Sequence, residues 1–428
     1  MSTGTKVVVI GGGWAGLSAA SELCHRGIKV DLFESNEYLG GRARSIAIAD
    51  LELDNGPHLL LGAYSDTLRL ITNYFDRSVE EYFDEQTLCL DIDNTTSKNY
   101  KSFYLLGTNL SSLIRAKGLS LREKLSMARF LLRLKRRAIK VLDNETVEQL
   151  LRRENQNDNL CTLLWYPLCI SAMNTPPHKA CGRTFLNVVS DALLQKKLAS
   201  HFLLPKKPLS QTFPEAASVF IKKHGGNIYT RKSVKLKLQP DEQFSVSGEL
   251  EKYTHAIIAS SPHQITNCFT DNELSNAAIA ITSNFKYEPI CSIYLQYSHE
   301  TNIQKKMVAY GSPNERWVFD KSYLSPGLIC VVLSSNGPHT ELTQEDLAET
   351  IEQELRDCFG YTTPSWKKVI TEKRATFSCV PDLERPPQKT NVKNLYLAGD
   401  YTYERYPATL ESAVRSGVNA AKLALEDM

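Results

Sequence analysis

The sequence has little net charge, no long apolar run and no paired cysteines. Its 428 residues carry 50 Lys and Arg against 48 Asp and Glu, a formal net charge of +2, so overall charge indicates no nucleic-acid partner. No apolar run reaches the roughly 20 residues of a membrane-spanning helix, and the first expected strand begins too early for a secretion signal. We therefore expect a cytoplasmic protein.

The ten cysteines are scattered, with no Cys-x-x-Cys pair and no histidine cluster at metal-ligand spacing. This distribution predicts reduced, mostly buried thiols and no metal site. The sequence also has no internal repeat and no low-complexity linker. A chain of this length can bury a sizeable core, as two domains or as one elaborate α/β unit.

The stretch Lys6–Ser35 carries the clearest pattern in the chain. An apolar run at residues 7–10 breaks into Gly11-Gly12-Gly13-Trp14-Ala15-Gly16, continues at helical spacing to Arg26, and returns as a second apolar run that ends at Glu34. Strand, glycine turn, helix, strand and terminal acid in this order predict a dinucleotide-binding βαβ unit. An ordinary glycine-rich turn is the alternative.

The residue types in this unit suit a pyrophosphate and a ribose. Gly11 permits the tight turn, Gly13 lets backbone amides approach a pyrophosphate, and Gly16 permits close helix–strand packing. Glu34 is placed to accept hydrogen bonds from a ribose 2′-OH. The residues predicted here to bind a dinucleotide are Gly11, Gly13, Trp14, Ala15, Gly16, Glu34 and Ser35. By itself the unit allows NAD or FAD.

Two further motifs narrow the cofactor to FAD. Gly40-Gly41-Arg42 offers bare amides and a guanidinium to a diphosphate, although a turn with a solvated arginine is the alternative. Near the C-terminus, a short strand ends in Gly399-Asp400, where the glycine permits close approach and the carboxylate can bond a ribitol hydroxyl. A helix then starts at Pro407-Ala408-Thr409, and its N-terminus can stabilise negative charge on the reduced ring.

The loop Asp54-Asn55-Gly56-Pro57-His58 follows a short predicted strand at residues 46–48 and then 51–53. These residue types form a tight turn without any ligand, so a simple loop is one interpretation. The other is a loop against the isoalloxazine ring, with Gly56, Pro57 and His58 as flavin neighbours. Both interpretations stay open at this point.

A strongly basic segment lies within the part from Tyr64 to about Leu163 that the sequence predicts to be mainly helical. Leu110–Leu142 carries ten Lys or Arg against one acid, Glu123, and its apolar residues recur at about helical spacing. A solvated helix face is the simpler interpretation. The alternative is a basic amphipathic surface that rests on the anionic inner face of a membrane.

Two apolar regions provide candidates for a substrate pocket. Residues 164–177 are almost uncharged and end in Asn-Thr-Pro-Pro, which predicts a buried helix stopped by prolines. Residues 285–386 predict strands at 290–296, 316–319 and 327–334. Core packing is the simpler interpretation of their side chains, and a pocket lining uses the same residue types. The candidate substrate contacts are Trp165, Leu168, Asn174, Trp317 and Phe319.

Along almost its whole length, the chain resembles one family of flavoproteins. The matching pieces are GGGWAGLSAA, YLGGRARS, DNGPHLLLGAY, PLCISAMNTPP, RWVFD and LAGDYTYERYPATLESAVRSG. On these motifs it is similar to the squalene-associated FAD-dependent desaturases, within the superfamily of amine oxidases and phytoene desaturases. The resemblance implies an α/β fold in which a Rossmann-like FAD-binding domain (1–70, 215–284 and 388–428) carries an inserted mixed α+β substrate domain (71–214 and 285–387). It also implies that the backbone of Val234 meets the adenine.

The implied reaction is reductive removal of the hydroxyl of hydroxysqualene, giving squalene, with the hydride supplied by reduced FAD. The substrate would be an apolar isoprenoid of the squalene and hopanoid pathway, and upstream prenyl synthases would be candidate partners. No pattern identifies the catalytic acid: His58 and Asp320 are candidates, beside the flavin itself or a bound water. The rival interpretations are a carotenoid-type desaturase, an amine oxidase and a non-catalytic FAD-binding partner of a prenyl synthase.

Overall fold

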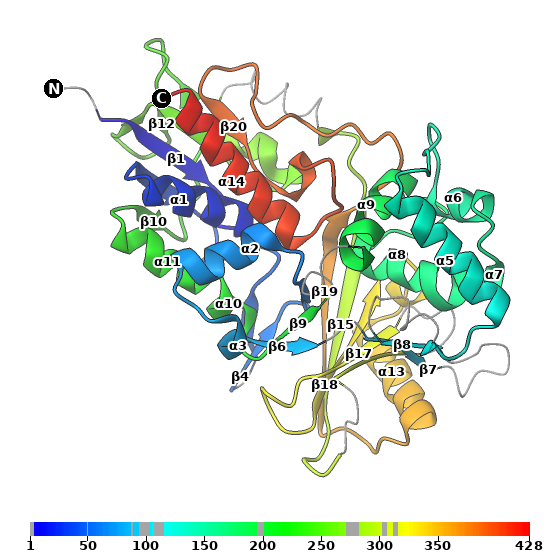
Figure 1. Cartoon of the computed structure of the whole chain (residues 1–428). Helices are drawn as coiled ribbons and strands as arrows, with labels where there is room; N and C mark the ends of the chain where they lie inside the picture. Colours follow the sequence, from blue (N-terminus) through cyan, green and yellow to red (C-terminus); the bar gives the residue numbers. More distant parts are fainter. Residues whose placement is uncertain are drawn as a thin grey trace.

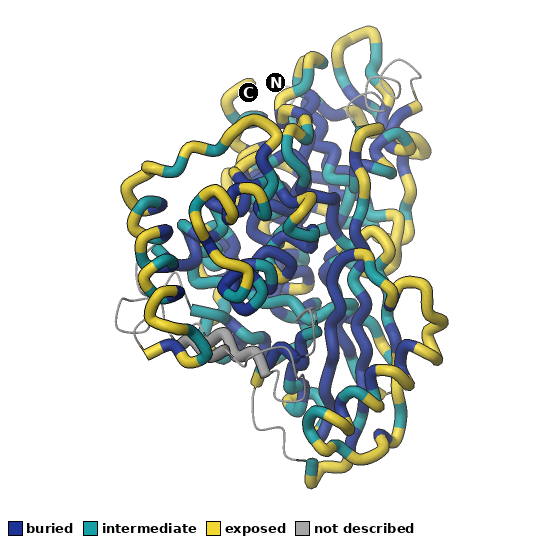
Figure 2. The backbone as a smooth tube through the Cα atoms, turned by 90° about the vertical axis from the view of Figure 1, so that its right-hand side faces the viewer, coloured by how far each residue is buried: buried dark blue, intermediate teal, exposed yellow. Residues whose placement is uncertain are grey.

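The computed structural model describes residues 4–48, 50–86, 89–93, 103–106, 115–194, 201–270, 282–301, 306–310 and 316–428. Two lobes lie side by side, and both ends of the chain belong to the lobe built around β1 and α1 (Figure 1). The other lobe combines a long sheet with a layer of helices. In Figure 2 the strands form the buried interior, while exposed segments lie on the outside.

A five-stranded parallel sheet forms the centre of the first lobe. Its order is β10 (Asn227–Tyr229), β2 (Lys29–Phe33), β1 (Lys6–Ile10), β14 (His255–Ile258) and β20 (Leu395–Leu397). Helices α1 (Trp14–His25), α11 (Pro214–Lys223) and α14 (Leu410–Glu426) pack on one face, and β11 (Leu236–Leu238), β12 (Phe244–Val246) and β13 (Lys252–Tyr253) on the other. Because both faces are buried, β1 is apolar at consecutive positions.

A seven-stranded sheet forms the centre of the second lobe. Its order is β19 (Trp366–Phe377), β15 (Tyr287–Gln296), β18 (Leu328–Ser334), β17 (Arg316–Asp320), β16 (Met307–Tyr310), β7 (Cys89–Asp93) and β8 (Phe103–Leu106). Helix α13 (Gln344–Phe359) covers one face, and the other faces α5 (Leu121–Lys135), α6 (Val147–Arg153), α8 (Tyr166–Met173) and α9 (Gly182–Leu193). Side chains of β17 alternate between these layers, since Trp317 and Phe319 face the helices and Val318 faces α13.

Shorter elements complete the two lobes. They are β3 (Ser45–Ile48), β4 (Leu51–Asp54), β5 (Leu60–Leu61), α2 (Ser65–Arg69), α3 (Val79–Tyr82), β6 (Phe83–Gln86), α7 (Asp158–Leu160), β9 (Phe202–Pro205) and α10 (Leu209–Thr212), with π-helical turns at Leu70–Tyr74 and Cys161–Trp165 and 3-10 turns at Pro262–Cys268, Pro338–Thr340 and Asp400–Thr402. The short strand predicted at residues 46–48 and 51–53 is two strands, β3 and β4, which pair antiparallel. The strands of the five-stranded sheet fall in the segments predicted for the FAD domain, and those of the seven-stranded sheet in the other segments; the exact domain boundaries stay a prediction.

The mainly helical prediction for residues 64–163 is wrong at β6, β7 and β8. Strand β6 pairs with β9, whereas β7 and β8 extend the long sheet through β16. The partner strands β9 and β16 lie more than 100 residues further along the chain. Local periodicity does not show such partners, which is why the sequence pattern missed these strands.

Candidate functional site

The loop after β1 forms the turn that the sequence predicts for a pyrophosphate. Gly13 lies at the N-terminus of α1, and a Cβ built on it would meet no atom within 4 Å. At Gly16, by contrast, a Cβ would overlap the carbonyl oxygen of Gly11, so only glycine permits this packing. An open backbone surface at a helix N-terminus suits an anionic phosphate group.

Glu34 follows β2 directly beside this turn. Its Oε2 accepts a hydrogen bond from the backbone N–H of Gly12 at 2.6 Å, and its Oε1 accepts one from the Ser35 hydroxyl at 3.2 Å. The backbone of residues 231–232 bonds to that of residues 34–36, which brings the segment leading to the buried Val234 alongside. The backbone N–H of Asn36 also donates to Oε1 at 2.7 Å. A carboxylate has about four lone-pair sites, so Glu34 keeps capacity for one ribose hydroxyl.

The Gly40–Gly41 turn packs against the same loop. The backbone N–H of Gly40 donates to the carbonyl oxygen of Gly12 at 2.8 Å. The indole N–H of Trp14 donates to the carbonyl oxygen of Ala43 at 2.8 Å and so holds the turn from its other side. The Trp14 side chain therefore has a structural role, and only its backbone stays available to a phosphate.

Arg42 connects the N-terminal and C-terminal motifs. Its Nη2 donates to both carboxylate oxygens of Asp400, at 3.0 and 2.9 Å, and its Nη1 donates to the carbonyl oxygen of Ala375 at 2.7 Å. Gly399 is fixed in turn, since its backbone N–H donates to the Ser416 hydroxyl at 2.7 Å. The predicted contacts of Arg42 with a diphosphate and of Asp400 with a ribitol hydroxyl stay predictions.

The segment Pro407-Ala408-Thr409 leads into α14 as the sequence predicts. Thr409 is the N-cap, and its hydroxyl accepts from the backbone N–H of Ser412 at 3.1 Å. The Ser412 hydroxyl donates to the carbonyl oxygen of Pro407 at 2.8 Å, which fixes the entry to the helix. The partial positive charge of this helix end suits a reduced, anionic flavin.

The buried polar atoms in this region fit a flavin ring. The hydroxyls of Tyr287, Ser292 and Tyr401 and Nδ1 of His263 have no hydrogen-bond partner within the described part of the chain. Burial raises the pKa of Tyr287 and Tyr401 and lowers that of His263, and the charge of Arg42 acts to lower all three. Ser292 lies beside Gly56. Each unpaired buried group costs about 1–3 kcal/mol. A flavin, with its amide and carbonyl groups, would supply partners, so these residues fit FAD.

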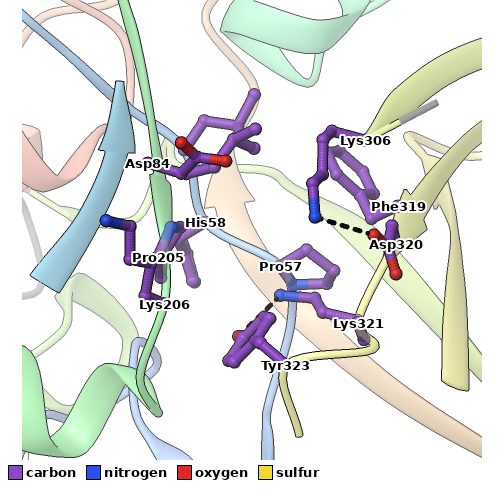
Figure 3. A pocket seen from close by; sticks show the side chains of 12 residues that line it. Pro57, His58, Asp84, Pro205, Lys206, Lys306, Phe319, Asp320, Lys321 and Tyr323 are labelled. Atoms are coloured by element: carbon purple, nitrogen blue, oxygen red, sulfur yellow. Dashed lines mark hydrogen bonds and ion pairs between the residues drawn. The ribbon is translucent and has the colours of Figure 1, made fainter. Parts of the chain in front are cut away.

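A cavity of about 60 Å³ opens beside Pro57 and His58 (Figure 3). Its other lining residues are Leu59, Asp84, Leu204, Pro205, Lys206, Lys306, Phe319, Asp320, Lys321 and Tyr323. In Figure 3 the Lys321 amine lies near Pro57 and bonds to Tyr323, whereas Lys306 bonds to Asp320. Phe319, a predicted substrate contact, therefore lines the same cavity as the predicted flavin loop. The contacts of this loop with flavin and of Phe319 with substrate stay predictions.

Neither predicted acid is in its protonated acid form at neutral pH. Burial lowers the pKa of His58 to about 4. The charges of Lys321 and Arg42 act in the same direction, whereas the charge of Asp54 acts to raise this pKa. Burial would raise the pKa of Asp320, but hydrogen bonds from Ser322 and Lys306 hold it below its usual value. His58 is therefore neutral and Asp320 is a carboxylate.

The remaining predicted substrate contacts lie in the protein core. Trp165 is fully buried between Phe130 and Phe185, with ring centroids 5.1 and 6.3 Å away, and its indole N–H donates to Gln156 at 3.0 Å. Leu168 and Trp317 belong to the same apolar cluster. Contact of these three residues with a substrate stays a prediction.

The side chain of Asn174 has a structural role, and its predicted contact with a substrate stays a prediction. Its side-chain amide donates to the Pro289 carbonyl oxygen at 3.2 Å and to the Thr376 hydroxyl at 2.9 Å, and its Oδ1 accepts from the backbone N–H of Ser335 at 2.6 Å. The residue also ends α8 in the left-handed conformation. Its amide is thus used to fix the helix end to the long sheet.

Sequence reasoning missed Lys321, Tyr323 and Ser292. The alternation of side chains along β17 could have indicated Lys321. It lies two residues after Phe319 and four after Trp317, so it is expected on the same face as these two residues. Ser292 lies inside an apolar strand, where nothing in the pattern distinguishes it from packing.

Comparisons with known proteins identify the family of this chain. The profile of the flavin-containing amine oxidoreductase family matches residues 14–425. The chain is 27% identical to a hydroxysqualene dehydroxylase of Zymomonas mobilis subsp. mobilis, over 97% of this chain and 98% of that protein. It is 22% identical to the 15-cis-phytoene desaturase of Narcissus pseudonarcissus, over 99% of this chain and 80% of that protein.

Among solved structures, an oxidoreductase from Methanosarcina mazei superimposes with a TM-score of 0.76 at 15% identity, covering 98% of this chain and 100% of that one. The predicted α/β fold class is confirmed by this likeness. The predicted FAD cofactor is confirmed by the family match. The chain belongs to the flavin-containing amine oxidoreductase family and is an FAD-dependent oxidoreductase.

Proposed function

We propose that this protein removes the hydroxyl group of hydroxysqualene reductively and yields squalene. Bound reduced FAD would supply the hydride. Full-length similarity to a hydroxysqualene dehydroxylase supports the choice of substrate, and the substrate would be an apolar isoprenoid made by upstream prenyl synthases. The protein would act at the inner face of a membrane.

One observation favours dehydroxylation over the related reactions: a buried ammonium group lies in the cavity beside the predicted flavin loop. Lys321 is only 3% exposed and shares this cavity with Phe319 and Leu59. A carotenoid-type desaturase removes hydrogen from a hydrocarbon, and such a substrate has no polar group that could bind this cation. A protonated amine has no lone pair with which to accept a hydrogen bond from it. A hydroxyl group, in contrast, accepts a hydrogen bond from an ammonium.

The chain would contribute to this reaction by binding, by orientation and by exclusion of water. The apolar cluster between α8, α9 and the long sheet provides the environment that a hydrocarbon chain prefers. The loop at Gly56–His58 joins the flavin region to the cavity, so it would set the distance between cofactor and substrate. A dry site protects a developing allylic cation from capture by water.

Anaerobic mixing of the FAD-loaded, reduced protein with hydroxysqualene tests the proposal. We expect flavin oxidation in parallel with one squalene per FAD, followed by absorbance and by product analysis. Conversion of phytoene by the oxidised protein would favour the desaturase, and flavin reduction by an amine would favour the amine oxidase. Bound FAD that reacts with none of these substrates would favour the non-catalytic partner.

We also propose that α5 rests on an anionic membrane. The helix begins with a capping box between Ser120 and Glu123 and buries Met127, Phe130 and Leu134 against the protein. Leu121, Leu125 and Leu132 are 73%, 63% and 47% exposed. At about 100° per residue these three leucines fall within roughly 40° of one another, so they form a single exposed stripe, which we call the leucine stripe.

Basic side chains flank the leucine stripe. Arg122, Arg129 and Arg136 recur every seven residues along one edge, all exposed, and Lys135 lies on the other edge. Within the described part of the chain no carboxylate forms an ion pair with these four residues, whereas Arg133, on the protein side, pairs with Glu154 at 2.9 Å. Each basic residue near an anionic surface contributes about 1 kcal/mol. Residues 110–114 of the predicted basic segment lie outside the described residues.

The leucine stripe would hold the protein to a bilayer surface without crossing it. Among the helices that the structure describes, none has the length and apolarity to span a membrane. Surface binding of this kind combines insertion of apolar side chains with attraction of basic ones to anionic lipid. A hydrocarbon substrate dissolved in the same bilayer would then be close to the protein.

The triple variant Leu121→Ser, Leu125→Ser, Leu132→Ser should weaken binding to phosphatidylglycerol vesicles by about tenfold or more, because it removes the inserting groups. The matched control is Leu250→Ser with Leu342→Ser, two other exposed leucines. Co-sedimentation at low and high salt measures the bound fraction. Equal binding by the triple variant and the control would contradict the proposal.

A further inference from the structure

Lys321 lies at the end of β17, on the face that carries Trp317 and Phe319. Its Nζ is 3.6 Å from Oδ2 of the fully buried Asp54 and 3.3 Å from the Tyr323 hydroxyl. Asp54 is itself fixed, because its Oδ1 accepts from the Ser45 hydroxyl and from the backbone N–H of Leu209. The counter-charge to the ammonium is therefore held in place by the loop that leads to Gly56–His58.

The Lys321 ammonium has more N–H donors than nearby hydrogen-bond acceptors. An ammonium has three N–H donors, and within the described residues only the Tyr323 hydroxyl lies within hydrogen-bond distance of it. Asp54 Oδ2 lies slightly beyond that distance and has no other hydrogen-bond partner there. Lys321 can thus keep its charge balanced by Asp54 and still direct an N–H into the cavity.

The other two lysines of the cavity are exposed to solvent, and its two predicted acids are not in their acid form. Lys306 and Lys206 are both exposed, and they donate to Asp320 at 3.0 Å and to the Glu80 carbonyl oxygen at 2.7 Å. Asp320 is ionised and His58 is neutral, as described above. Burial would lower the pKa of Lys321, but Tyr323 and Asp54 more than offset it, so its pKa lies above the usual value and the group is an ammonium.

We propose that Lys321 is the catalytic proton donor, giving a proton from Nζ to the hydroxyl oxygen of the substrate as the C–O bond breaks. This step rests on the proposed dehydroxylation. The electron pair of the C–O bond leaves with the oxygen, which takes the proton and departs as water. The carbon receives the hydride that reduced FAD supplies, and neutral Lys321 recovers a proton from solvent water.

The position of Lys321 in the fold supports this role. Asp54, the counter-charge of Lys321, is followed by Asn55, whose side-chain amide donates to the carbonyl oxygen of Arg42 at 3.2 Å. The ammonium, the flavin loop and the Arg42–Asp400 pair therefore belong to one region. A hydroxyl bound to Lys321 would thus lie next to the predicted flavin ring. The cavity of about 60 Å³ holds only a few water molecules, which suits a small polar group better than a long chain.

The test compares two leaving groups in the variant Lys321→Met. General acid catalysis contributes about 10²–10⁴-fold, so anaerobic flavin oxidation by hydroxysqualene should slow by about 100-fold or more. Oxidation by the acetate ester of the same alcohol should slow by less than about tenfold, because acetate leaves without a proton. The matched control is Lys367→Met, a lysine of the same sheet that pairs with Glu352.

Two further readouts separate a chemical role from a structural one. FAD content, and substrate binding followed by perturbation of the oxidised flavin spectrum, should stay within about threefold of wild type in Lys321→Met. If this variant loses FAD, Lys321→Arg replaces it: arginine keeps the charge but does not readily release a proton, so FAD should bind normally while oxidation by the alcohol slows at least tenfold.

The outcomes distinguish the two proposals. If the wild type oxidises flavin with hydroxysqualene and Lys321→Met does so at the same rate, Lys321 is not the proton donor. Equal slowing with the alcohol and the ester would also overturn its role as an acid. If the wild type reacts with neither substrate, the proposed dehydroxylation itself fails.

Discussion

At the residue scale, the cofactor site depends on single side chains that two neighbouring loops hold in place. Glu34 shows this most clearly, since its carboxylate accepts from the turn before α1 and from the residues that follow β2. Its contact with a ribose is a prediction from the sequence, because an acid at the end of the second strand of a βαβ unit occupies the position that bonds to a ribose. The role of Lys321 was not predictable in the same way, because a lysine after an apolar strand is usually exposed.

We expect the variant Glu34→Ala to bind FAD about 10- to 100-fold more weakly, because charge-assisted hydrogen bonds contribute about 1.5–3 kcal/mol. Titration of the FAD-free protein, followed by quenching of flavin fluorescence, measures the affinity. Glu37→Ala is the matched control, since this nearby acid is exposed and pairs with Arg231 at the surface. An unchanged affinity in Glu34→Ala would show that the carboxylate does not hold the ribose.

At the scale of elements, the contact between α1 and α14 determines how the two ends of the chain come together. A Cβ on Gly417 would overlap the carbonyl oxygen of Ala15, and a Cβ on Gly16 would overlap that of Gly11. Glycine thus lets α14 approach α1 and lets α1 approach β1. The helix after Thr409 was predictable from its cap and apolar period, but its close partner was not, because no local pattern encodes a neighbour about 400 residues away.

The variant Gly417→Ala tests this contact, because two effects predict changes of opposite sign in the free energy of unfolding. Helix propensity alone would stabilise the protein by about 1 kcal/mol. Overlap with α1 should instead destabilise it by about 1–3 kcal/mol, which we expect to prevail. Thermal or urea unfolding measures the change, with Lys422→Ala on the exposed face of α14 as control. A rise in stability would mean that the two helices can separate at no cost.

At the scale of the whole molecule, function depends on residues that meet only because the chain crosses between the lobes. Arg42 and Asp400 are 358 positions apart and form a direct ion pair. Lys321 and Asp54 come from the end of β17 and the end of β4, and they meet beside the predicted flavin loop. The sequence predicted the motifs on each side, but it did not predict strands β6–β8 or the cavity, since both arise from pairings distant in sequence.

One measurement tests the proposed reaction most directly. The FAD-loaded protein is reduced anaerobically in D₂O, mixed with hydroxysqualene for a single turnover, and the product is analysed by mass spectrometry and NMR. We predict one squalene per FAD oxidised, with one deuterium on the carbon that carried the hydroxyl group. Oxidised flavin without squalene, or squalene without deuterium at that carbon, would contradict the account.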